Sequence, residues 1–279
     1  MLDLAPLPPA TGEVSVRQAA ALSVLLVCVL ASEATAQPYA WVTSHGHWSS
    51  GFTATIAVVN LATGGNVAAF RVPPGINIGG GALTPDGRYY LVATSIGIAR
   101  FTTNPPALDR MLAPGVAVTA LAIAPTGRRL YATGHFGRAV LDWETGVPER
   151  VECCAQPRIS FTPNGTVRIE ITGGTPTTTP VTVTALDEAT GARRWEWTGP
   201  TGTGAGLVAV SDSQLAVALG STIRVLDVNT GAESGSAQLT ETVGGIVWRG
   251  ESLLVSRNAQ VAAFFKRPRL SAFTLPAMT

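Results

Sequence analysis

The sequence predicts an all-β chain made of about six similar units of four strands each, and three observations agree on this. Charged residues make up only 13% of the chain while Gly occurs 30 times, a composition that favours strands and turns over helices. Two short turn patterns alternate along the chain. Their period is near 40 residues, which matches four strands with their turns. A unit of that size buries both faces of its sheet only against neighbouring units, so we expect a β-propeller.

The first pattern is an apolar run that ends in Asp or Asn and is followed by Thr-Gly. It closes at residues 60–64, 142–146, 187–191 and 227–231. The Thr-Gly pairs stand 82, 45 and 40 residues apart, so the first interval holds one degenerate copy, which residues 98–101 supply. The repeated acids are Asp86, Asp142, Asp187 and Asp227. Because they recur at the blade period, we interpret them as turn caps rather than as acid/base residues.

The second pattern is a strand, a Pro-x-Gly turn and another strand. It occurs at residues 85–87, 125–127 and 163–165, with weaker copies at 210–213 and 248–251. Proline presets the first turn position and Gly accepts a positive φ, so each copy predicts a hairpin. The glycine runs at residues 79–81 and 201–204 are interpreted as loops.

Six units can be marked, and they start near residues 39, 81, 120, 158, 206 and 246. The first begins at its second strand, because Tyr39 aligns with Tyr89 rather than with Ala82. The sixth is expected to hold four strands of its own and to end with residues 270–275. Two alternatives stay open: the first blade is short, or a terminal strand is missing and the ring is one strand or blade short of closure.

Two of the predicted strands resemble those of the YVTN-type β-propellers, which are WD40-like repeat proteins. The strands are Tyr-Ala-Trp-Val-Thr at residues 39–43 and Leu-Tyr-Ala-Thr at 130–133. The resemblance covers nearly the whole chain after residue 36 and implies a blade shape shared with quinoprotein and lactonase propellers. This chain lacks the length for the usual seven blades of that family.

Residues 1–36 have the features of a signal peptide. Arg17 precedes an apolar run at residues 19–30, and Ala34-Thr35-Ala36 forms a small-x-small cleavage site. The run is shorter than the roughly 20 apolar residues that span a bilayer. We therefore expect cleavage before Gln37, a propeller domain over residues 37–279, a secreted or periplasmic protein and no integral membrane segment after cleavage.

The charge pattern argues against a nucleic-acid partner. The formal net charge is +1, and the one basic cluster is residues 266–269. Binding to phosphate backbones requires many Lys and Arg contacts, which a solvated strand end of this size does not supply. The expected partner is a protein or a small molecule.

Cys153 and Cys154 are adjacent, and an oxidising export compartment favours a vicinal disulfide between them. Their Cα atoms would be about 3.8 Å apart, closer than in ordinary disulfides, so the ring would be strained. Three interpretations stay open: a structural pair, which we favour, a platform facing a ligand as in pyrroloquinoline quinone alcohol dehydrogenases, or a thiol metal site.

Two histidines, His45 and His47, are weak candidates for metal ligands. An extended segment would place both imidazoles on one side, but His135 is the only other histidine and a polar loop is the favoured interpretation. No catalytic residue, metal site or cofactor is predicted. Four tryptophans are expected to pack between blades: Trp143, Trp195, Trp197 and Trp248.

The favoured function is an exported, non-enzymatic binding or protein-interaction scaffold that uses the loops at its blade edges. The alternative is a propeller enzyme of lactonase or quinoprotein type. The sequence has no nucleophile elbow, phosphate-binding glycine loop or histidine-based metal motif. Because propellers carry many unrelated functions, the fold by itself does not choose between these classes.

Overall fold

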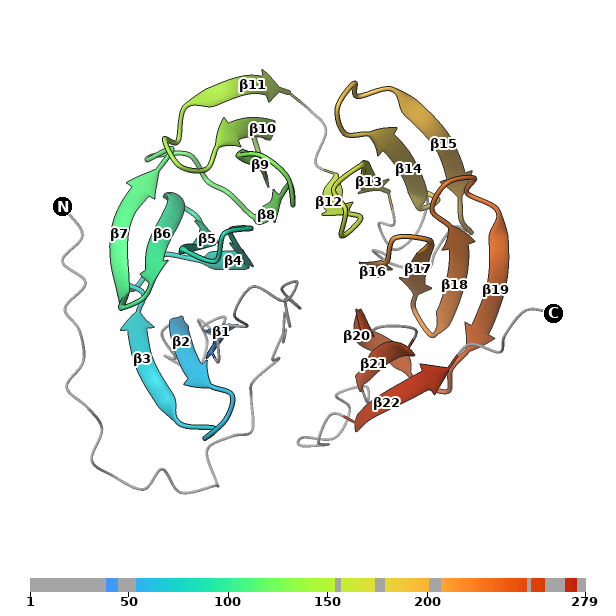
Figure 1. Cartoon of the computed structure of the whole chain (residues 1–279), viewed down its shortest axis with the longest axis horizontal. Coiled ribbons are helices and arrows are strands. Elements are labelled where there is room, and N and C mark those ends of the chain that lie inside the picture. The colour runs from blue at the N-terminus through green and yellow to red at the C-terminus, as the bar shows by residue number, and fades with distance from the viewer. Residues whose placement is uncertain are drawn as a thin grey trace. The chain divides into compact units, whose positions relative to one another are not determined.

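The computed structural model describes residues 39–44, 54–153, 157–173, 179–200, 207–249, 252–258 and 269–274. Within these residues every regular element is a β-strand, and the strands form six antiparallel sheets, numbered here as blades 1 to 6 along the chain (Figure 1). The chain divides into two compact units, residues 1–156 and 157–279, and each is described by itself. No helix in the described part of the chain has the length and apolar character needed to cross a membrane.

The N-terminal unit contains blades 1 to 3, in which strands that follow one another in sequence also pair with one another. Blade 1 consists of β1 (Tyr39–Ser44), β2 (Thr55–Asn60) and β3 (Asn66–Arg71). Blade 2 consists of β4 (Ile78–Leu83), β5 (Tyr89–Thr94), β6 (Gly97–Thr103) and β7 (Pro106–Leu112). Blade 3 consists of β8 (Ala120–Ile123), β9 (Arg129–Gly134), β10 (Gly137–Asp142) and β11 (Pro148–Glu152).

The C-terminal unit contains blades 4 to 6 with the same sequential pairing. Blade 4 consists of β12 (Arg158–Phe161), β13 (Val167–Thr172), β14 (Thr182–Asp187) and β15 (Arg193–Thr198). Blade 5 consists of β16 (Leu207–Val210), β17 (Gln214–Leu219), β18 (Thr222–Asp227) and β19 (Glu233–Gln238). Blade 6 consists of β20 (Thr242–Arg249), β21 (Ser252–Asn258) and β22 (Arg269–Thr274).

The observed blades confirm the predicted repeat. They start at residues 39, 78, 120, 158, 207 and 242, close to the predicted positions. Strand β1 contacts β4, the first strand of the next blade, in the same way that β5, the second strand of blade 2, contacts β8. Strand β1 therefore occupies the position of a second strand, as the alignment of Tyr39 with Tyr89 predicts. The sixth blade has three strands in the described residues rather than the expected four, and residues 259–268 lie outside that part.

The glycine run at residues 79–81 is part of strand β4 and not a loop, so that interpretation was wrong. A Cβ added to Gly79 would lie 2.2 Å from the carbonyl oxygen of Thr119 in the approach to the next blade. A Cβ added to Gly81 would lie 2.1 Å from the hydroxyl oxygen of Tyr90. Gly79 and Gly81 are therefore explained by close approach of neighbouring groups to the strand, whereas nothing lies within 4 Å of a Cβ added to Gly80. The second run, residues 201–204, lies outside the described residues.

The hydrophobic cores lie between consecutive blades of a unit, and each middle blade contributes to two of them. In β5, Tyr90 and Val92 pack with blade 1, whereas Leu91 and Ala93 pack with blade 3. In the C-terminal unit, β17 divides in the same way: Leu215, Val217 and Leu219 pack with blade 4, and Ala216 and Ala218 with blade 6. Successive residues of a strand point to opposite faces, so both faces are buried.

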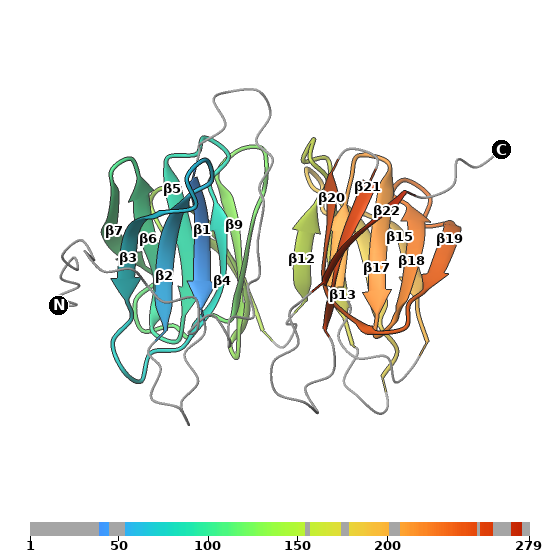
Figure 2. The same cartoon turned by 90° about the horizontal axis from the view of Figure 1, so that it is seen from below.

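The third and fourth strands of every blade that has both show a register shift in their pairing. The shifts fall at Val58/Val59, Arg100/Phe101, Val140/Leu141, Ala185/Leu186 and Val225/Leu226. Such a bulge bends the strand and increases its twist. The strands of each unit run up and down beside one another, so the first–second and third–fourth turns gather at one end (Figure 2).

Candidate binding site in blade 2

The repeated acids are turn caps, which confirms that interpretation. Asp142 accepts hydrogen bonds from the backbone N–H groups of Glu144 and Thr145, both at 2.8 Å. Asp227 accepts bonds from the N–H groups of Asn229 at 2.9 Å and Thr230 at 2.8 Å. Each carboxylate thereby satisfies donors of its own turn.

Hydrogen bonding keeps these carboxylates ionised. The Arg194 guanidinium and then the Thr190 N–H lower the pKa of Asp187 to about 2. The Thr230 N–H is the main cause that lowers the pKa of Asp227. These acids are fixed as acceptors within turns and do not hold a proton near neutral pH.

In three blades the capped turn packs on the Pro-x-Gly turn or its counterpart in the same blade. The residue after the capping Asp donates its N–H to that turn: Trp143 to the Arg128 carbonyl at 2.9 Å, Glu188 to Thr166 at 3.1 Å, and Val228 to Ser213 at 2.9 Å. The two turns together close this end of the blade. A blade that lacks the capped turn therefore has fewer residues covering this end of its sheet.

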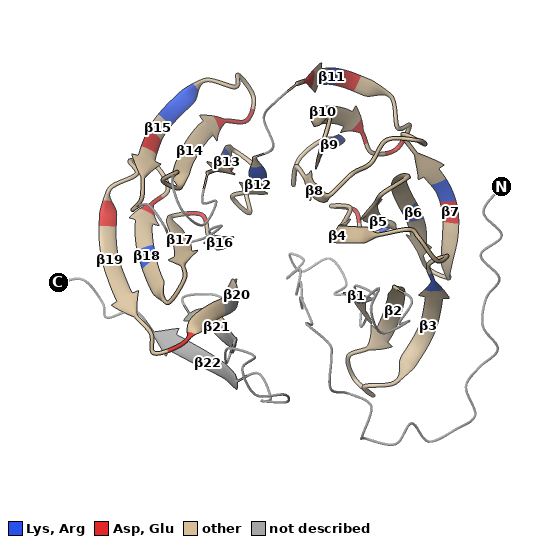
Figure 3. Cartoon of the chain, turned by 180° about the vertical axis from the view of Figure 1, so that it is seen from behind, with Lys and Arg blue, Asp and Glu red and all other residues tan. Residues whose placement is uncertain are grey.

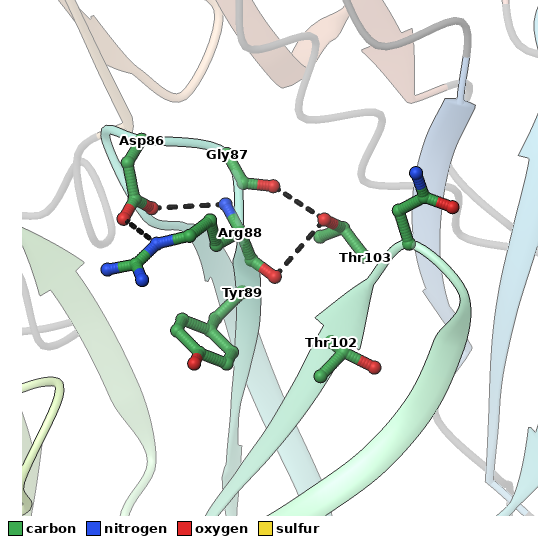
Figure 4. A pocket seen from close by; sticks show the side chains of 7 residues that line it. Asp86, Gly87, Arg88, Tyr89, Thr102 and Thr103 are labelled. Carbon is green, nitrogen blue, oxygen red and sulfur yellow. Dashed lines mark hydrogen bonds and ion pairs between the residues drawn. The ribbon is translucent and has the colours of Figure 1, made fainter.

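Blade 2 is the one with the degenerate copy, and there the capped turn is absent. Asn104 and Pro105 alone join β6 to β7, and Thr103 stands where blade 3 has Trp143. Thr103 keeps its N–H bond to the Arg88 carbonyl at 3.0 Å, and its hydroxyl donates to the Gly87 carbonyl at 2.6 Å. The shortened turn leaves an open hollow of about 300 Å³ (Figure 4). Its lining consists of Asp86, Gly87, Arg88, Tyr89, Thr102, Thr103 and Asn104.

Arg88 is the most prominent charged group of the hollow. Its Nε donates to Asp86 at 2.5 Å, yet 56% of the side chain is exposed. Burial raises the pKa of Asp86, but hydrogen bonds from Thr84 and Arg88 outweigh it, so the pKa is lowered and the carboxylate is ionised. The Tyr89 ring lies 4.3 Å from the Arg100 guanidinium carbon and 5.5 Å from that of Arg88, a cation–π arrangement.

Beside the hollow, four guanidinium groups from blades 2 and 3 contact Glu144. The Glu144 carboxylate oxygens lie 3.5 Å from Arg88 Nη2 and 2.6 Å from Arg128 Nη1. Its carbonyl accepts hydrogen bonds from Arg100, at 2.5 Å, and from Arg110. We call this set the Glu144 cluster; it also includes Asp86 and Asp109, which pair with Arg88 and Arg100. Asp109 and Arg110 are the red and blue segments of β7 in Figure 3.

Few of the other predicted site residues lie in the described part of the chain. Cys153 is exposed just after β11, while Cys154, His45 and His47 lie outside the described residues. His135 is exposed in the turn between β9 and β10. Among the residues that can be described, no group of three His, Cys, Asp or Glu side chains is placed to hold a metal ion.

The tryptophans of the described part pack between blades, as predicted. Trp143 is buried in the core between blades 2 and 3. Trp195 of blade 4 is buried against blade 5, where its Nε1–H donates to the Val228 carbonyl at 2.6 Å. Trp197 is half-buried against the same core. The side chain of Trp248 lies outside the described residues.

Sequence reasoning missed the hollow and the Glu144 cluster. The signal for the hollow was present in the degenerate copy at residues 98–101, because a turn that departs from its repeat changes the surface there. The cluster carries no local signal, since Arg88 and Arg128 belong to Pro-x-Gly turns of different blades.

Comparisons with known proteins identify the fold but no family. No protein-family model and no curated protein matches this sequence. A chain from the crystal structure of the mitotic checkpoint complex, a WD40 propeller protein, is 14% identical with a TM-score of 0.66; the match covers 85% of this chain and 70% of that one. A crystal structure of the computationally designed Ika8 protein is 15% identical with a TM-score of 0.55, over 80% of this chain and 66% of that one.

The chain is a β-propeller. The six sequential antiparallel sheets, the cores between neighbouring blades and the similarity to a WD40 propeller agree on this. In all, 974 chains of solved structures are similar to this one. A fold so widely shared assigns no function by itself, so the function must be argued from the site.

Proposed function

We propose that this chain is an exported, non-enzymatic β-propeller that binds a partner protein through the turns of blades 2 and 3. The observation that carries the proposal is the hollow in blade 2. It lies where the repeat is interrupted, and it is open and lined mostly by polar residues. An open surface of this kind suits contact with another chain better than binding of a small substrate, which needs a pocket that encloses most of the ligand.

The chemistry of the surrounding residues supports binding over catalysis. The repeated aspartates are ionised turn caps, and Arg88 and Asp86 are paired with each other. Arginine and tyrosine are enriched at protein interfaces, and here Tyr89 lies against two guanidinium groups beside an exposed Asn104.

The export and the repeat family are parts of the same proposal. The features of residues 1–36 support a cleaved signal peptide and a secreted or periplasmic protein. The strands at residues 39–43 and 130–133 support membership of the YVTN-type repeats. The similarity to a WD40 propeller is consistent with an interaction scaffold.

Site-specific photo-crosslinking in the exported protein tests this function. A photoreactive amino acid replaces Asn104 at the rim of the hollow, and a matched variant carries it at Ser236, another exposed position, on β19. We expect a defined protein adduct from position 104 and none from position 236. No adduct at either position, or the same adducts at both, would contradict the proposed binding surface.

An enzymatic role would give a different result. Hydrolysis of a lactone by the purified mature chain, or retention of pyrroloquinoline quinone through gel filtration, would favour the lactonase or quinoprotein alternative. Either activity should then survive replacement of Asn104, because the hollow would not be its site.

A further inference from the structure

We propose that β3, the outer strand of blade 1, pairs edge to edge with β3 of a second copy of this chain and forms a symmetric dimer. This inference goes beyond the proposed binding function and concerns a different blade from the hollow. Strand β3 lies at the end of its sheet and pairs with β2 on one side. Among the residues that the structure describes, no strand pairs with its other side. An unpaired edge of this kind is a template for a further strand.

The sequence of β3 lacks the features that protect the other outer edges. Each fourth strand of blades 2 to 5 contains an acidic side chain, and β7 and β11 also begin with proline. The acids are Asp109, Glu149, Glu152, Glu196 and Glu233. Strand β3 reads Asn-Val-Ala-Ala-Phe-Arg, with neither an acid nor a proline. Charges and proline keep sheet edges from pairing, so β3 is the least protected of these five strands.

The direction of the backbone groups of β3 follows from its bonding to β2. The N–H of Val72, directly after β3, donates to the Ala54 carbonyl at 2.9 Å, so Val72 faces β2. Successive residues of an antiparallel strand direct their N–H and C=O groups to opposite sides. Phe70 therefore faces β2, whereas Ala69 and Arg71 face the free edge. Each of these two residues offers a donor and an acceptor to an added strand.

The side chains of β3 also favour a neighbouring strand. Val67 is 46% exposed, and Val and Phe are among the residues most enriched in strands. Phe70 and Ala68 are half-buried against the core between blades 1 and 2. A strand added at the free edge would extend this sheet and cover part of the Val67 side chain. Pairing would thus satisfy free backbone groups and bury apolar surface together.

Symmetry and charge choose the register of this pairing. A twofold axis between two identical antiparallel strands can be centred on Ala69, Phe70 or Arg71. Centring on Arg71 places two guanidinium groups opposite each other, and centring on Phe70 leaves them two residues apart. Centring on Ala69 separates them by four residues, about 14 Å along the strands, which exceeds the screening length of about 8 Å at physiological salt.

The edge is complementary to itself in the register centred on Ala69, which is why the occupant is a second copy. The Ala69 residues of the two copies exchange both N–H···O bonds across the axis. Arg71 lies opposite the uncharged Val67 of the other copy, so no like charges meet. Interfaces of standard size give Kd values from micromolar to picomolar, and a pairing through one strand should be weaker, with a Kd above about 1 μM.

Sedimentation equilibrium of the mature chain measures the dimer, and proline variants locate it. Ala69→Pro removes an outward N–H and should raise the Kd roughly tenfold to a hundredfold, because the twofold axis removes two hydrogen bonds at once. Ser236→Pro is the matched control. The Leu239 N–H donates to the Ser221 carbonyl at 2.8 Å, so Ser236 of β19 faces outwards as Ala69 does. We expect this control to leave the Kd unchanged.

Cysteine variants test the register without relying on proline. They are made in a chain with Cys153→Ser and Cys154→Ser, so that only the new thiol can react. Ala69→Cys should form a disulfide-linked dimer on mild oxidation, because the paired Cα atoms would lie about 5.5 Å apart. Arg71→Cys and Ser236→Cys should not, since the first places its thiols about 14 Å apart along the strands and the second lies on another blade.

Four results would overturn the inference. They are a chain that stays monomeric at about 1 mM, equal effects of the two proline variants, cross-linking of Arg71→Cys in preference to Ala69→Cys, and a disulfide from Ala69→Cys to a different protein in the exported material. The last result would show that the edge receives a foreign strand. None of them alters the cross-linking expected at Asn104, so the dimer and the proposed binding surface stand or fall separately.

Discussion

Replacing Gly231 with alanine tests how the capped turns hold neighbouring blades together. Gly231 closes the capped turn of blade 5 with a φ of +73°, and a Cβ added there would lie 2.7 Å from the Trp195 ring of blade 4. Trp195 is 9% exposed and cannot move away without losing its hydrogen bond to the Val228 carbonyl. The alanine therefore meets both a backbone and a steric penalty.

A matched variant isolates the steric penalty. Gly191 closes the same turn in blade 4 with a φ of +71°, but nothing lies within 4 Å of its added Cβ. Forcing alanine into this left-handed conformation costs about 1–2 kcal/mol at either position. Overpacking against a fixed ring adds about 1–3 kcal/mol, and only Gly231→Ala incurs it. We expect Gly231→Ala to lower the free energy of unfolding by about 2–5 kcal/mol and Gly191→Ala by about 1–2 kcal/mol.

Urea unfolding of the mature chain measures this difference. Both glycines lie in the C-terminal unit, so both variants report on the same transition, and the slope of each curve checks that the transition stays cooperative. Equal midpoints for the two variants would refute the reasoning, because they would show that the Trp195 contact adds nothing to the backbone penalty.

Three further predictions concern acid stability, export and the cysteines. The pKa of Asp187 is about 2 in the folded chain against 3.8 for the free side chain, so its contribution to stability is present above pH 4 and is lost as the pH falls through 2. Asp187→Asn should therefore lower the melting temperature at pH 7. In this variant the melting temperature should also fall less steeply between pH 4 and pH 2 than in the unaltered chain; the same dependence on pH in both proteins would contradict this. N-terminal sequencing of the exported protein should begin at Gln37, and retention of residues 19–30 would refute cleavage. Intact-mass analysis of fresh exported protein should show a gain of two hydrogens on reduction of Cys153 and Cys154, and replacing both by Ser should lower the melting temperature without affecting binding; two free thiols would remove the disulfide hypothesis.

The elements that the sequence predicted best are those fixed by local chemistry. A Pro-x-Gly turn or a capping aspartate needs no distant partner, so the positions of Gly87, Gly127 and Asp142 marked hairpins that the structure confirms. The blade period followed from these turns, because each one separates two strands of similar length.

What the sequence could not reveal depends on contacts between residues far apart in the chain. The glycines at residues 79–81 suggested a loop, yet they lie in strand β4, where Thr119 and Tyr90 leave no room for a Cβ at Gly79 and Gly81. The register shifts between third and fourth strands have no single-residue signature, since they depend on how two strands fit across the sheet. The Glu144 cluster gathers arginines from two blades, which only the folded arrangement brings together.

The division of β5 and β17 between two cores has a consequence for how the chain can change. Blade 2 serves as a wall common to both cores of its unit, so its loss would uncover apolar surface on both neighbours at once. Insertion of a complete blade, in contrast, adds a sheet with two apolar faces, and these can cover the faces of the two blades between which it is inserted. Such a chain is expected to tolerate gain of a whole repeat better than loss of one, with coupling confined to adjacent sheets as in a one-dimensional array. Deletion of half of a repeat would leave an apolar sheet face uncovered, and we expect it to destabilise the fold.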